Sequence, residues 1–297
     1  MRVAFAGTAP FAESVLTGII GSRHAPVVVV TNPDRPRGRH GTPQAPGVKT
    51  AALAAGLAVL QPDSIGEPEA VRALIGFEPD VFVACAYGQI VGDAVLGALP
   101  CLVVHPSPVP RWRGAAPVER ALMAGETALG VVTLQMTAGV DEGPVADERA
   151  VAVPAEADAG EAYRLLAPVA VASLLATLDG MKDGTVRWRP QEGPATYAPK
   201  ITAADRQIDW ARPATAISDQ VRALSPDIGA VTELLGRRTA IWRSRAGDGP
   251  PPKPSPDRLG LRCGEGWLEV LELQQEGRRR MTAAEFLRGA GRALAGR

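Results

Sequence analysis

A histidine and an aspartate are the residues of this chain whose positions favour acid–base chemistry. His105 directly follows the apolar run CLVV, and Asp141 lies in the glycine-rich turn TAGVDEGP. Histidine titrates near neutrality and is the residue used most often for proton transfer. The two residues are 36 positions apart, so their spacing alone does not establish that they pair. An aspartate in such a turn is also a common turn former.

The loop after His105 has the composition of a functional loop. It contains Ser107, three prolines at alternate positions (106, 108 and 110) and the run Arg111-Trp112-Arg113-Gly114. Loops at strand ends carry function more often than the elements they connect. His105 is also one of only three histidines in the chain. We therefore take His105 as the candidate catalytic residue.

Several common sites are excluded by the motifs. The turn GTAPFA (7–12) lacks the glycine spacing of a dinucleotide fold, and no phosphate-binding loop is present. The three cysteines are scattered, odd in number and without metal-ligand spacing, so we expect no disulfide framework and no metal. The N-terminal run lacks the features of a signal peptide, and we expect a cytoplasmic protein.

The elements that must position His105 are short apolar strands that alternate with helices. This alternation is typical of a parallel sheet covered on both faces. We expect an α/β, doubly wound, mainly parallel sheet with sites at the carboxyl ends of its strands. The expected strands are 2–7, 26–32, 57–62, 80–86 and 101–105, and the expected helices are 12–20, 48–57 and 69–77.

A second, smaller domain is predicted after a linker. A hairpin (131–136 and 145–153) and a long helix (158–180) complete the first domain, and glycine, proline and threonine then interrupt the pattern. A helix at 214–224 and four strand-length pieces indicate a small OB-like β-barrel. The predicted divisions are 1–185 for the first domain, 186–205 for the linker and 206–297 for the C-terminal domain.

The charge is divided between these two parts. Residues 200–297 hold 17 Lys and Arg against 12 Asp and Glu, a net charge of +5, and the rest of the chain balances it to zero. A basic rear module beside an acidic front one suggests different partners. No apolar run reaches the roughly 18–20 residues of a membrane span, so we expect no membrane partner.

Seven segments resemble the methionyl-tRNA formyltransferase family, in the family's order and over nearly the whole chain. HPS-x-x-PRWRGAAP and TYAPK are the most specific of them. The full set is GTAPFA, NPDRPRGRHGTPQAPGVK, PDVFVACAYGQI, HPSPVPRWRGAAPVERALMAGET, GVVTLQMTAGVDEGPV, TYAPKIT…IDW and RRRMTAAEFLRG.

The resemblance implies transfer of a formyl group from 10-formyltetrahydrofolate to the α-amino group of methionyl initiator tRNA. His105 would stabilise the oxyanion or carry the proton, and Asp141 would hold the histidine and a water. Folate would lie in a cleft formed by two segments. These are Ala86, Tyr87, Gly88 and Gln89, and then Ser107, Pro108, Val109 and Pro110.

The sequence departs from the family at one catalytic position. The family has an Asn-x-His pattern at the end of this strand, and Val103 stands at the asparagine position. Valine cannot donate to the formyl oxygen. Loss of one oxyanion donor lowers a rate by about 10²–10³. We therefore expect a slow transferase, a donor from elsewhere, or a protein that binds without catalysis.

The tRNA contacts implied by the resemblance are arginines. A single loop after the second strand carries two of them, and the basic C-terminal module carries the others. They are Arg37 and Arg39, then Arg237, Arg238, Arg278, Arg279 and Arg280. Such contacts to phosphate make affinity salt-dependent. We expect the protein to act as a monomer.

Two other functions fit the same sequence. An N-formyltransferase acting on a nucleotide-linked amino sugar shares the catalytic domain, although the RWRGAAP loop and the basic C-terminal module favour tRNA. A non-catalytic paralogue that binds folate or tRNA is the other, and Val103 is its main support.

Overall fold

The structure, a computed structural model, describes residues 1–36, 41–250, 255 and 257–290. The chain divides into two compact units. Unit 1 comprises Met1–Pro117, Ala128–Ala152 and Tyr163–Ala198. Unit 2 comprises Val118–Thr127, Val153–Ala162 and the chain from Pro199 onward. Arg37 and Arg39 lie outside the described residues.

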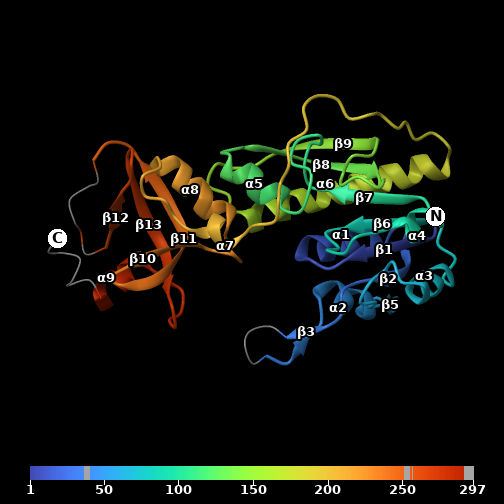
Figure 1. The fold of residues 1–297 in the computed structure, drawn as a ribbon, viewed down its shortest axis with the longest axis horizontal. Helices are drawn as coiled ribbons and strands as arrows, with labels where there is room; N and C mark the ends of the chain where they lie inside the picture. The colour runs from blue at the N-terminus through green and yellow to red at the C-terminus, as the bar shows by residue number, and fades with distance from the viewer. Residues whose placement is uncertain (37–40, 251–254, 256, 291–297) are drawn as a thin grey trace. The chain divides into compact units, whose positions relative to one another are not determined.

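Unit 1 is built around a seven-stranded sheet (Figure 1). Its strands are β1 (Val3–Gly7), β2 (Pro26–Val30), β5 (Ala58–Leu60), β6 (Val81–Cys85), β7 (Cys101–His105), β8 (Ala128–Gln135) and β9 (Val145–Ala152). Their order is β5-β2-β1-β6-β7-β8-β9. The first five strands are parallel, whereas β8 and β9 are antiparallel. The prediction of a mainly parallel sheet is confirmed.

Helices cover both faces of this sheet, as the doubly wound prediction requires. On one face Leu74 of α3 and Val95 of α4 pack in one cluster with Phe82 of β6. On the other face, Thr133 of β8 and Ser173 of α6 share a buried hydrogen bond of 2.8 Å. The helices of unit 1 are α1 (Pro10–Ile20), α2 (Gly47–Ala54), α3 (Pro68–Ile75), α4 (Asp93–Leu96) and, from Tyr163 onward, α6 (Ala159–Lys182). Helix α5 (Pro117–Met123) belongs to unit 2 from Val118 onward.

Helix α6 has the length and composition of a membrane span. Its apolar side chains nevertheless follow helical spacing into the protein interior, where Leu166, Ala170, Leu174 and Leu178 are fully buried. A core helix that is shielded by a sheet and its neighbours has this same composition. We therefore describe α6 as the central core helix of unit 1.

Unit 2 contains an antiparallel sheet in the order β10-β11-β13-β12, with β14 paired to β13. Its elements are β10 (Ala230–Leu234), β11 (Arg237–Gly247), β12 (Leu259–Arg262), β13 (Trp267–Gln275), β14 (Met281–Thr282), α7 (Ala203–Arg206), α8 (Ala214–Ala223) and α9 (Ala283–Ala290). The four predicted strands and the helix at 214–224 are confirmed. Among the described residues the pairings leave β10 and β12 as edges, so an OB-like closed barrel stays a prediction.

Short elements were missing from the prediction. Helices α4, α5, α7 and α9, the strand β14 and the hairpin of β3 (Arg35–Pro36) and β4 (Pro43–Gln44) were not expected. All of them have eight residues or fewer, so each offers few positions at which a repeating apolar pattern can appear. They are specified by their packing and by capping. For example, Thr202 and Asp205 form a capping box at the start of α7.

A buried arginine ties the separate segments of unit 2 together. Arg222 of α8 is 8% exposed, and its guanidinium donates to the carbonyl oxygens of Ala157, Leu122 and Glu126. Its Nε also donates to Asp219 at 2.7 Å. A buried guanidinium needs such acceptors, because an unpaired charge is costly in the interior. The segments at 118–127 and 153–162 therefore supply acceptors that α8 requires.

An ion-pair cluster forms at the carboxyl end of α6. Asp179 accepts hydrogen bonds from Arg23 at 2.7 Å and from Nε2 of the buried His24 at 2.6 Å. These two bonds lower the pKa of Asp179 to about 2, and the bond from Arg23 has the larger effect. The cluster links the turn before β2 to the end of α6.

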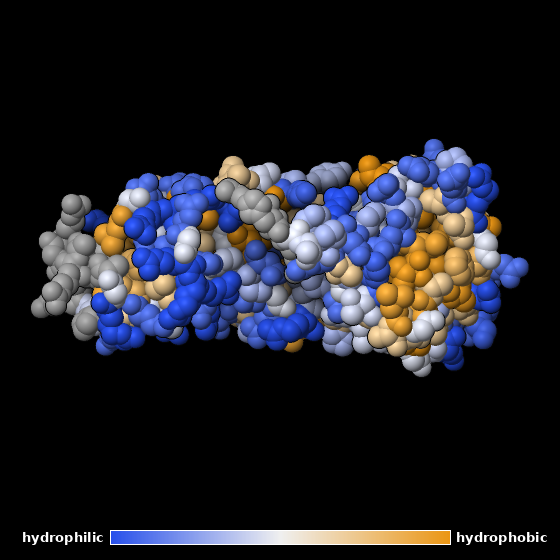
Figure 2. Space-filling view, turned by 90° about the horizontal axis from the view of Figure 1, so that it is seen from below, coloured by the Kyte–Doolittle hydropathy of each residue, from blue (hydrophilic) through white to orange (hydrophobic). Residues whose placement is uncertain are grey.

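One side of unit 1 is apolar at its surface. Figure 2 shows an apolar area on the part of unit 1 where α2 and β5 lie in Figure 1. Leu53 of α2 is 58% exposed, and all three residues of the edge strand β5 are half-buried. Single exposed apolar residues are common on protein surfaces, whereas a contiguous apolar area is less common.

Candidate active site

The strand β7 delivers His105 to the carboxyl edge of the parallel strands. Val103 pairs with Ala84 of the parallel β6, and His105 pairs with Val132 of the antiparallel β8. The strands β1 and β6 end at the same edge, at Gly7 and Cys85. Loops that follow parallel strands meet at this edge, which is where open α/β sheets bind ligands.

His105 is paired with Asp141, which the sequence could not establish. The His105 side chain is 6% exposed, and its Nδ1 lies 3.5 Å from Oδ2 of Asp141. Its Nε2 lies 3.0 Å from the main-chain oxygen of Trp112. Because a carbonyl oxygen only accepts, Nε2 carries a hydrogen and donates it. Nδ1 faces the carboxylate of Asp141, and it donates to that carboxylate when the ring carries a second hydrogen.

Asp141 is held in place by the loop after His105. Its Oδ2 accepts the N–H of Gly114 at 2.9 Å, and its own backbone has a φ of +52°. Gln191 donates to the main-chain oxygens of Asp141 at 2.7 Å and Gly143 at 2.8 Å. Gln191 in turn accepts from Arg113 at 2.7 Å. Hydrogen bonds thus hold both the side chain and the main chain of Asp141 in place.

Gly114 shows why glycine is needed in this loop. Its φ is +116°, and an added Cβ would lie 3.0 Å from the oxygen of Ala198. Residues 113–116 and 196–198 run alongside each other, with Arg113 N–H donating to Thr196 at 2.9 Å and Ala198 N–H donating to Arg113 at 2.7 Å. The predicted linker therefore contributes Gln191 and this second segment to the site. The segment 196–198 lies in the TYAPK motif, which the sequence marked as specific to the family without predicting a role for its residues.

The segment Ser107–Pro110 closes the histidine loop. Ser107 is 2% exposed, and its hydroxyl donates to the carbonyl of Arg111 at 2.8 Å. Val109 is buried, whereas Pro108 and Pro110 are half-buried. Ser107 therefore maintains the loop shape, and the two prolines give the segment its accessible surface.

The segment Ala86–Gln89 is held against the ends of β1 and β2. The carbonyl of Ala86 accepts the N–H groups of Thr8 and Ala9, both at 3.2 Å. Gln89 donates to Asn32 at 2.9 Å. Ala86 and Gly88 are exposed and have positive φ values of +43° and +84°. Because glycine has no side chain, the exposed Gly88 presents its main chain at the same edge as His105.

Tyr87 is buried beneath this segment. Its side chain belongs to the apolar cluster of the sheet, and its hydroxyl has no hydrogen-bond partner among the described residues. Burial raises the pKa of this phenol. The ring therefore packs beneath the exposed residues Ala86 and Gly88.

Val103 stands two residues before His105 and on the same face of β7. It is half-buried and packs against an aliphatic cluster. The cluster consists of Val109, Val132, Leu134 and Val145. This surface beside the histidine is apolar, and Val103 supplies no hydrogen-bond donor there.

The arginines of unit 2 divide into two groups. Arg280 is 3.9 Å from the ring centroid of Trp242 and donates to Pro226 at 2.9 Å, and Arg279 pairs with Glu285 at 2.7 Å. All five of these arginines are exposed, and the other three are Arg237, Arg238 and Arg278. The N–H of Glu276 donates to the carbonyl of Arg238 at 2.9 Å, so these three lie on neighbouring turns.

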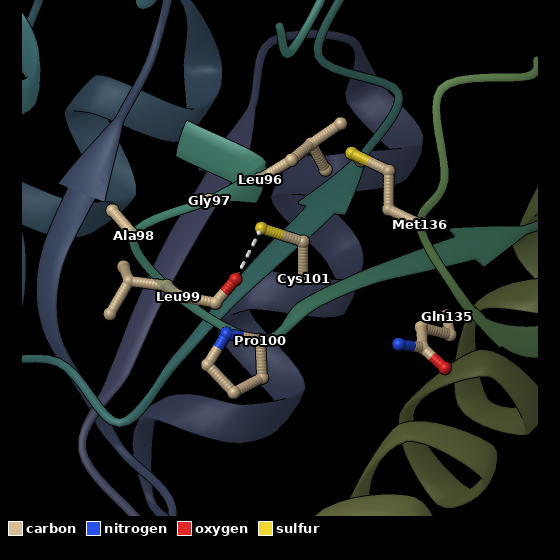
Figure 3. A pocket seen from close by; sticks show the side chains of 8 residues that line it. All are labelled: Leu96, Gly97, Ala98, Leu99, Pro100, Cys101, Gln135 and Met136. Carbon is tan, nitrogen blue, oxygen red and sulfur yellow. Dashed lines mark hydrogen bonds between the residues drawn. The ribbon is translucent and has the colours of Figure 1, made fainter. Parts of the chain in front are cut away.

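A pocket of about 370 Å³ lies at the opposite end of β7 (Figure 3). It is lined by residues 96–101 with Gln135 and Met136. Cys101 opens β7 and donates to the carbonyl of Leu99 at 3.3 Å. His105 closes the same strand, so this pocket is separate from the histidine and its loop.

At the carboxyl edge of its α/β sheet the chain brings the buried His105 within 3.5 Å of the half-buried carboxylate of Asp141. The sequence matches the formyl transferase domain over residues 1–178 and the formyl transferase C-terminal domain over residues 200–291. The chain therefore belongs to the formyl transferase family.

Two relatives agree with this assignment. The methionyl-tRNA formyltransferase of Thiobacillus denitrificans is 42% identical over 306 residues, covering 99% of this chain and 97% of the relative. That of Paracoccus denitrificans is 42% identical over 293 residues, covering 97% of each.

The fold is similar to that of HypX from Aquifex aeolicus, solved in complex with tetrahydrofolic acid. The TM-score is 0.70 at 19% identity. The match covers 100% of this chain and 48% of HypX, so this chain spans about half the length of that protein. At this identity the likeness shows the fold alone.

Proposed function

We propose that this protein transfers a formyl group from 10-formyltetrahydrofolate to the α-amino group of methionyl initiator tRNA. The His105–Asp141 pair carries the proposal, because it stands at the carboxyl edge of the sheet in a chain 42% identical to methionyl-tRNA formyltransferases over 99% of its length. The reaction serves the start of translation, so a cytoplasmic location belongs to the same proposal.

The proton has a defined path in this reaction. A free α-amino group has a pKa of about 7.7–8.0, so a substantial fraction is neutral and able to attack near neutrality. A bond forms between the amine nitrogen and the formyl carbon, the bond to N10 of the folate breaks, and one proton moves from the amine to N10. Nδ1 of His105 accepts that proton and returns it, while the nearby Asp141 carboxylate stabilises the charged ring.

Folate fits the surface formed by the loops after β6 and β7. The exposed main chain of Gly88 offers hydrogen-bonding groups, and Ala86, Pro108 and Pro110 offer an apolar surface. Tyr87 and Val109 support these two segments from below, whereas Gln89 and Ser107 fix their shape. The bound folate supplies the activated formyl group, and the chain binds and orients it beside His105.

The tRNA would be bound by the exposed arginines. Arg237, Arg238 and Arg278 are available for phosphates. Arg279 and Arg280 are engaged with Glu285 and Trp242, so their contribution is smaller. Arg37 and Arg39 belong to the same proposal through the family resemblance. We also keep an OB-like C-terminal domain at 206–297 and a monomeric protein as parts of this proposal.

Formylation of a nucleotide-linked amino sugar is the second candidate. The same His–Asp pair would serve it, because the attacking group is again an amine. The relatives with full-length matches are methionyl-tRNA formyltransferases, and this favours the tRNA substrate. A non-catalytic binding protein is the third candidate, and the apolar surface at Val103 is the observation in its favour.

The test is formyl transfer from 10-formyltetrahydrofolate to methionyl initiator tRNA, with His105→Ala and Asp141→Asn beside the wild type. Loss of a general acid–base group lowers kcat by about 10²–10⁴. The Asp141→Asn variant keeps an oxygen that can accept from Gly114 but loses the charge, so its loss of rate should be smaller. Ile75→Ala, at the end of α3, is the control and should match the wild type.

The three candidates give different outcomes. Transfer to an amino-sugar nucleotide but not to tRNA would establish the second candidate. Folate binding without transfer to either acceptor would establish the third. A His105→Ala variant that retains the wild-type rate would rule out the role given to His105.

A further inference from the structure

Two aromatic residues and an arginine lie on two hydrogen-bonded segments, one of which contacts His105 through the main-chain oxygen of Trp112. Trp112 N–H donates to the hydroxyl of Thr196 at 2.9 Å, and Arg113 and Tyr197 form a parallel β-bridge. Trp112 and Tyr197 thus lie on adjoining segments. We call Arg111, Trp112 and Tyr197 the aromatic rim.

The rim is accessible, and among the aromatic residues that the structure describes Tyr197 alone is exposed. The Tyr197 side chain is 61% exposed, Trp112 is half-buried and Arg111 is exposed. The next residue along, Ala198, is completely buried. The backbone of this segment is therefore anchored in the fold, while the tyrosine ring points away from the core. The guanidinium of Arg111 lies 5.7 Å from the centroid of the Trp112 ring.

The rim is rigidly connected to the catalytic site. The carbonyl of Trp112 accepts the hydrogen bond from Nε2 of His105 at 3.0 Å. Trp112 also has a φ of +62°, which is uncommon for a bulky residue. Strained backbone of this kind persists where the surroundings fix it, and it concentrates at ligand-binding sites. Any group that contacts the rim is therefore placed at a fixed position relative to His105.

An exposed aromatic surface beside an arginine matches the recognition chemistry of unpaired nucleotides. Single-stranded bases stack on aromatic rings and on arginine guanidinium planes. In an aminoacyl-tRNA, the amino acid and the terminal base are attached to the same ribose. When the α-amino group reaches His105, the terminal adenine must lie close to the histidine loop.

We propose that the aromatic rim stacks the unpaired 3′-terminal adenine of the RNA substrate and so positions its aminoacyl group at His105. This inference rests on the proposed tRNA function, and it assigns a ligand to Trp112 and Tyr197. The arginines of unit 2 would bind phosphates, whereas the rim binds the base. Stacking of this kind tolerates different bases, so the rim positions the acceptor end and does not select the tRNA.

The first experiment measures stacking directly, without turnover. An acceptor-stem RNA hairpin carries 2-aminopurine as its 3′-terminal base, and its fluorescence falls when that base stacks. The wild type should quench the fluorescence, as should Tyr197→Phe, because phenylalanine keeps the ring. Tyr197→Ala should lose most of the quenching, and Ile75→Ala should keep it. Absence of quenching with the wild type would overturn the proposal.

The second experiment measures turnover with two substrates. One is methionyl initiator tRNA, and the other is the same tRNA with an abasic 3′-terminal nucleotide. Alanine substitution of a stacking residue is worth roughly 1–3 kcal/mol per base. We expect Tyr197→Ala to lower kcat/KM about tenfold on the intact substrate, mainly through KM. On the abasic substrate the wild type and Tyr197→Ala should be equal.

These results separate the rim from the formyl-transfer proposal. An equal loss for Tyr197→Ala on both substrates would mean that Tyr197 acts through the fold, and would overturn the stacking role. Quenching by the wild type in the absence of formyl transfer would instead support the rim as an RNA-end site and refute the proposed reaction.

Discussion

The replacement Val103→Asn tests whether the apolar surface beside His105 limits the reaction. Val103 lies on the same face of β7 as the histidine and packs with Leu134 and Val145. An asparagine here would place an amide donor beside the reacting carbonyl. The matched control is Val103→Leu, because leucine has the shape of asparagine without its hydrogen-bond donors.

Two opposite effects are expected from this replacement. One restored oxyanion donor is worth about 10²–10³ in kcat, or roughly 3–4 kcal/mol of transition-state stabilisation. Placing the amide in a half-buried aliphatic cluster costs about 1–3 kcal/mol of folding free energy if the amide finds no partner. Val103→Asn should therefore unfold at a lower urea concentration than the wild type, and it alone of the two variants should transfer formyl groups faster.

The assay is single-turnover formyl transfer with saturating folate, combined with urea unfolding of each variant. An increase in kcat that Val103→Leu does not share would show that the missing donor limits the wild type. If Val103→Asn folds and transfers formyl groups no faster than the wild type, then Val103 does not limit the rate. The oxyanion would then be stabilised by other groups of the site.

Four further replacements test the histidine loop, the ion-pair cluster at the end of α6 and the arginines of unit 2. Gly114→Ala places a Cβ 3.0 Å from the Ala198 oxygen at a φ of +116°. We therefore expect the free energy of unfolding to fall by about 1–3 kcal/mol. An unchanged midpoint in urea unfolding would contradict this expectation. The pKa of Asp179 is lowered to about 2 in the folded state and is about 3.9 when unfolded, so its contribution to stability is complete above about pH 4 and is lost as the pH falls through 2. Between pH 4 and 2 the melting temperature of Asp179→Asn should fall less steeply than that of the wild type, and parallel curves would refute the assignment. Arg278→Ala should raise the KM for tRNA and reduce the salt dependence of that KM. Arg280→Ala should mainly lower the melting temperature, because Arg280 packs on Trp242. The reverse pattern would mean that Arg280 contacts phosphate and Arg278 stabilises the fold.

The arrangement of the sheet could be predicted because its residues repeat. Strands β1, β2 and β6 are continuous apolar runs between helical patterns, and only a sheet covered on both faces buries such runs. Ladder register and strand order could not be predicted in this way. The antiparallel pairing of β8 next to β7 depends on contacts between distant segments.

The candidate site was predictable only in part. The position of His105 at a strand end was visible in the sequence, whereas its pairing with Asp141 depends on the bond from Gly114 to the carboxylate. Gln191 gave no signal of its own, because a glutamine in a proline-rich stretch has no pattern that predicts its partners. It contacts the Asp141 turn only because residues 113–116 and 196–198 align.

The buried Arg222 has a consequence for how this chain can be divided by recombination. Its guanidinium reaches carbonyls at Leu122, Glu126 and Ala157, which the gene encodes well before the C-terminal segment. A fragment that begins at Pro199 would keep the arginine and lose those three acceptors. A crossover at that point would have to bring compatible 118–127 and 153–162 segments with it. The C-terminal module is therefore inherited together with two short pieces of the N-terminal half, although the family boundary in the sequence falls near residue 200.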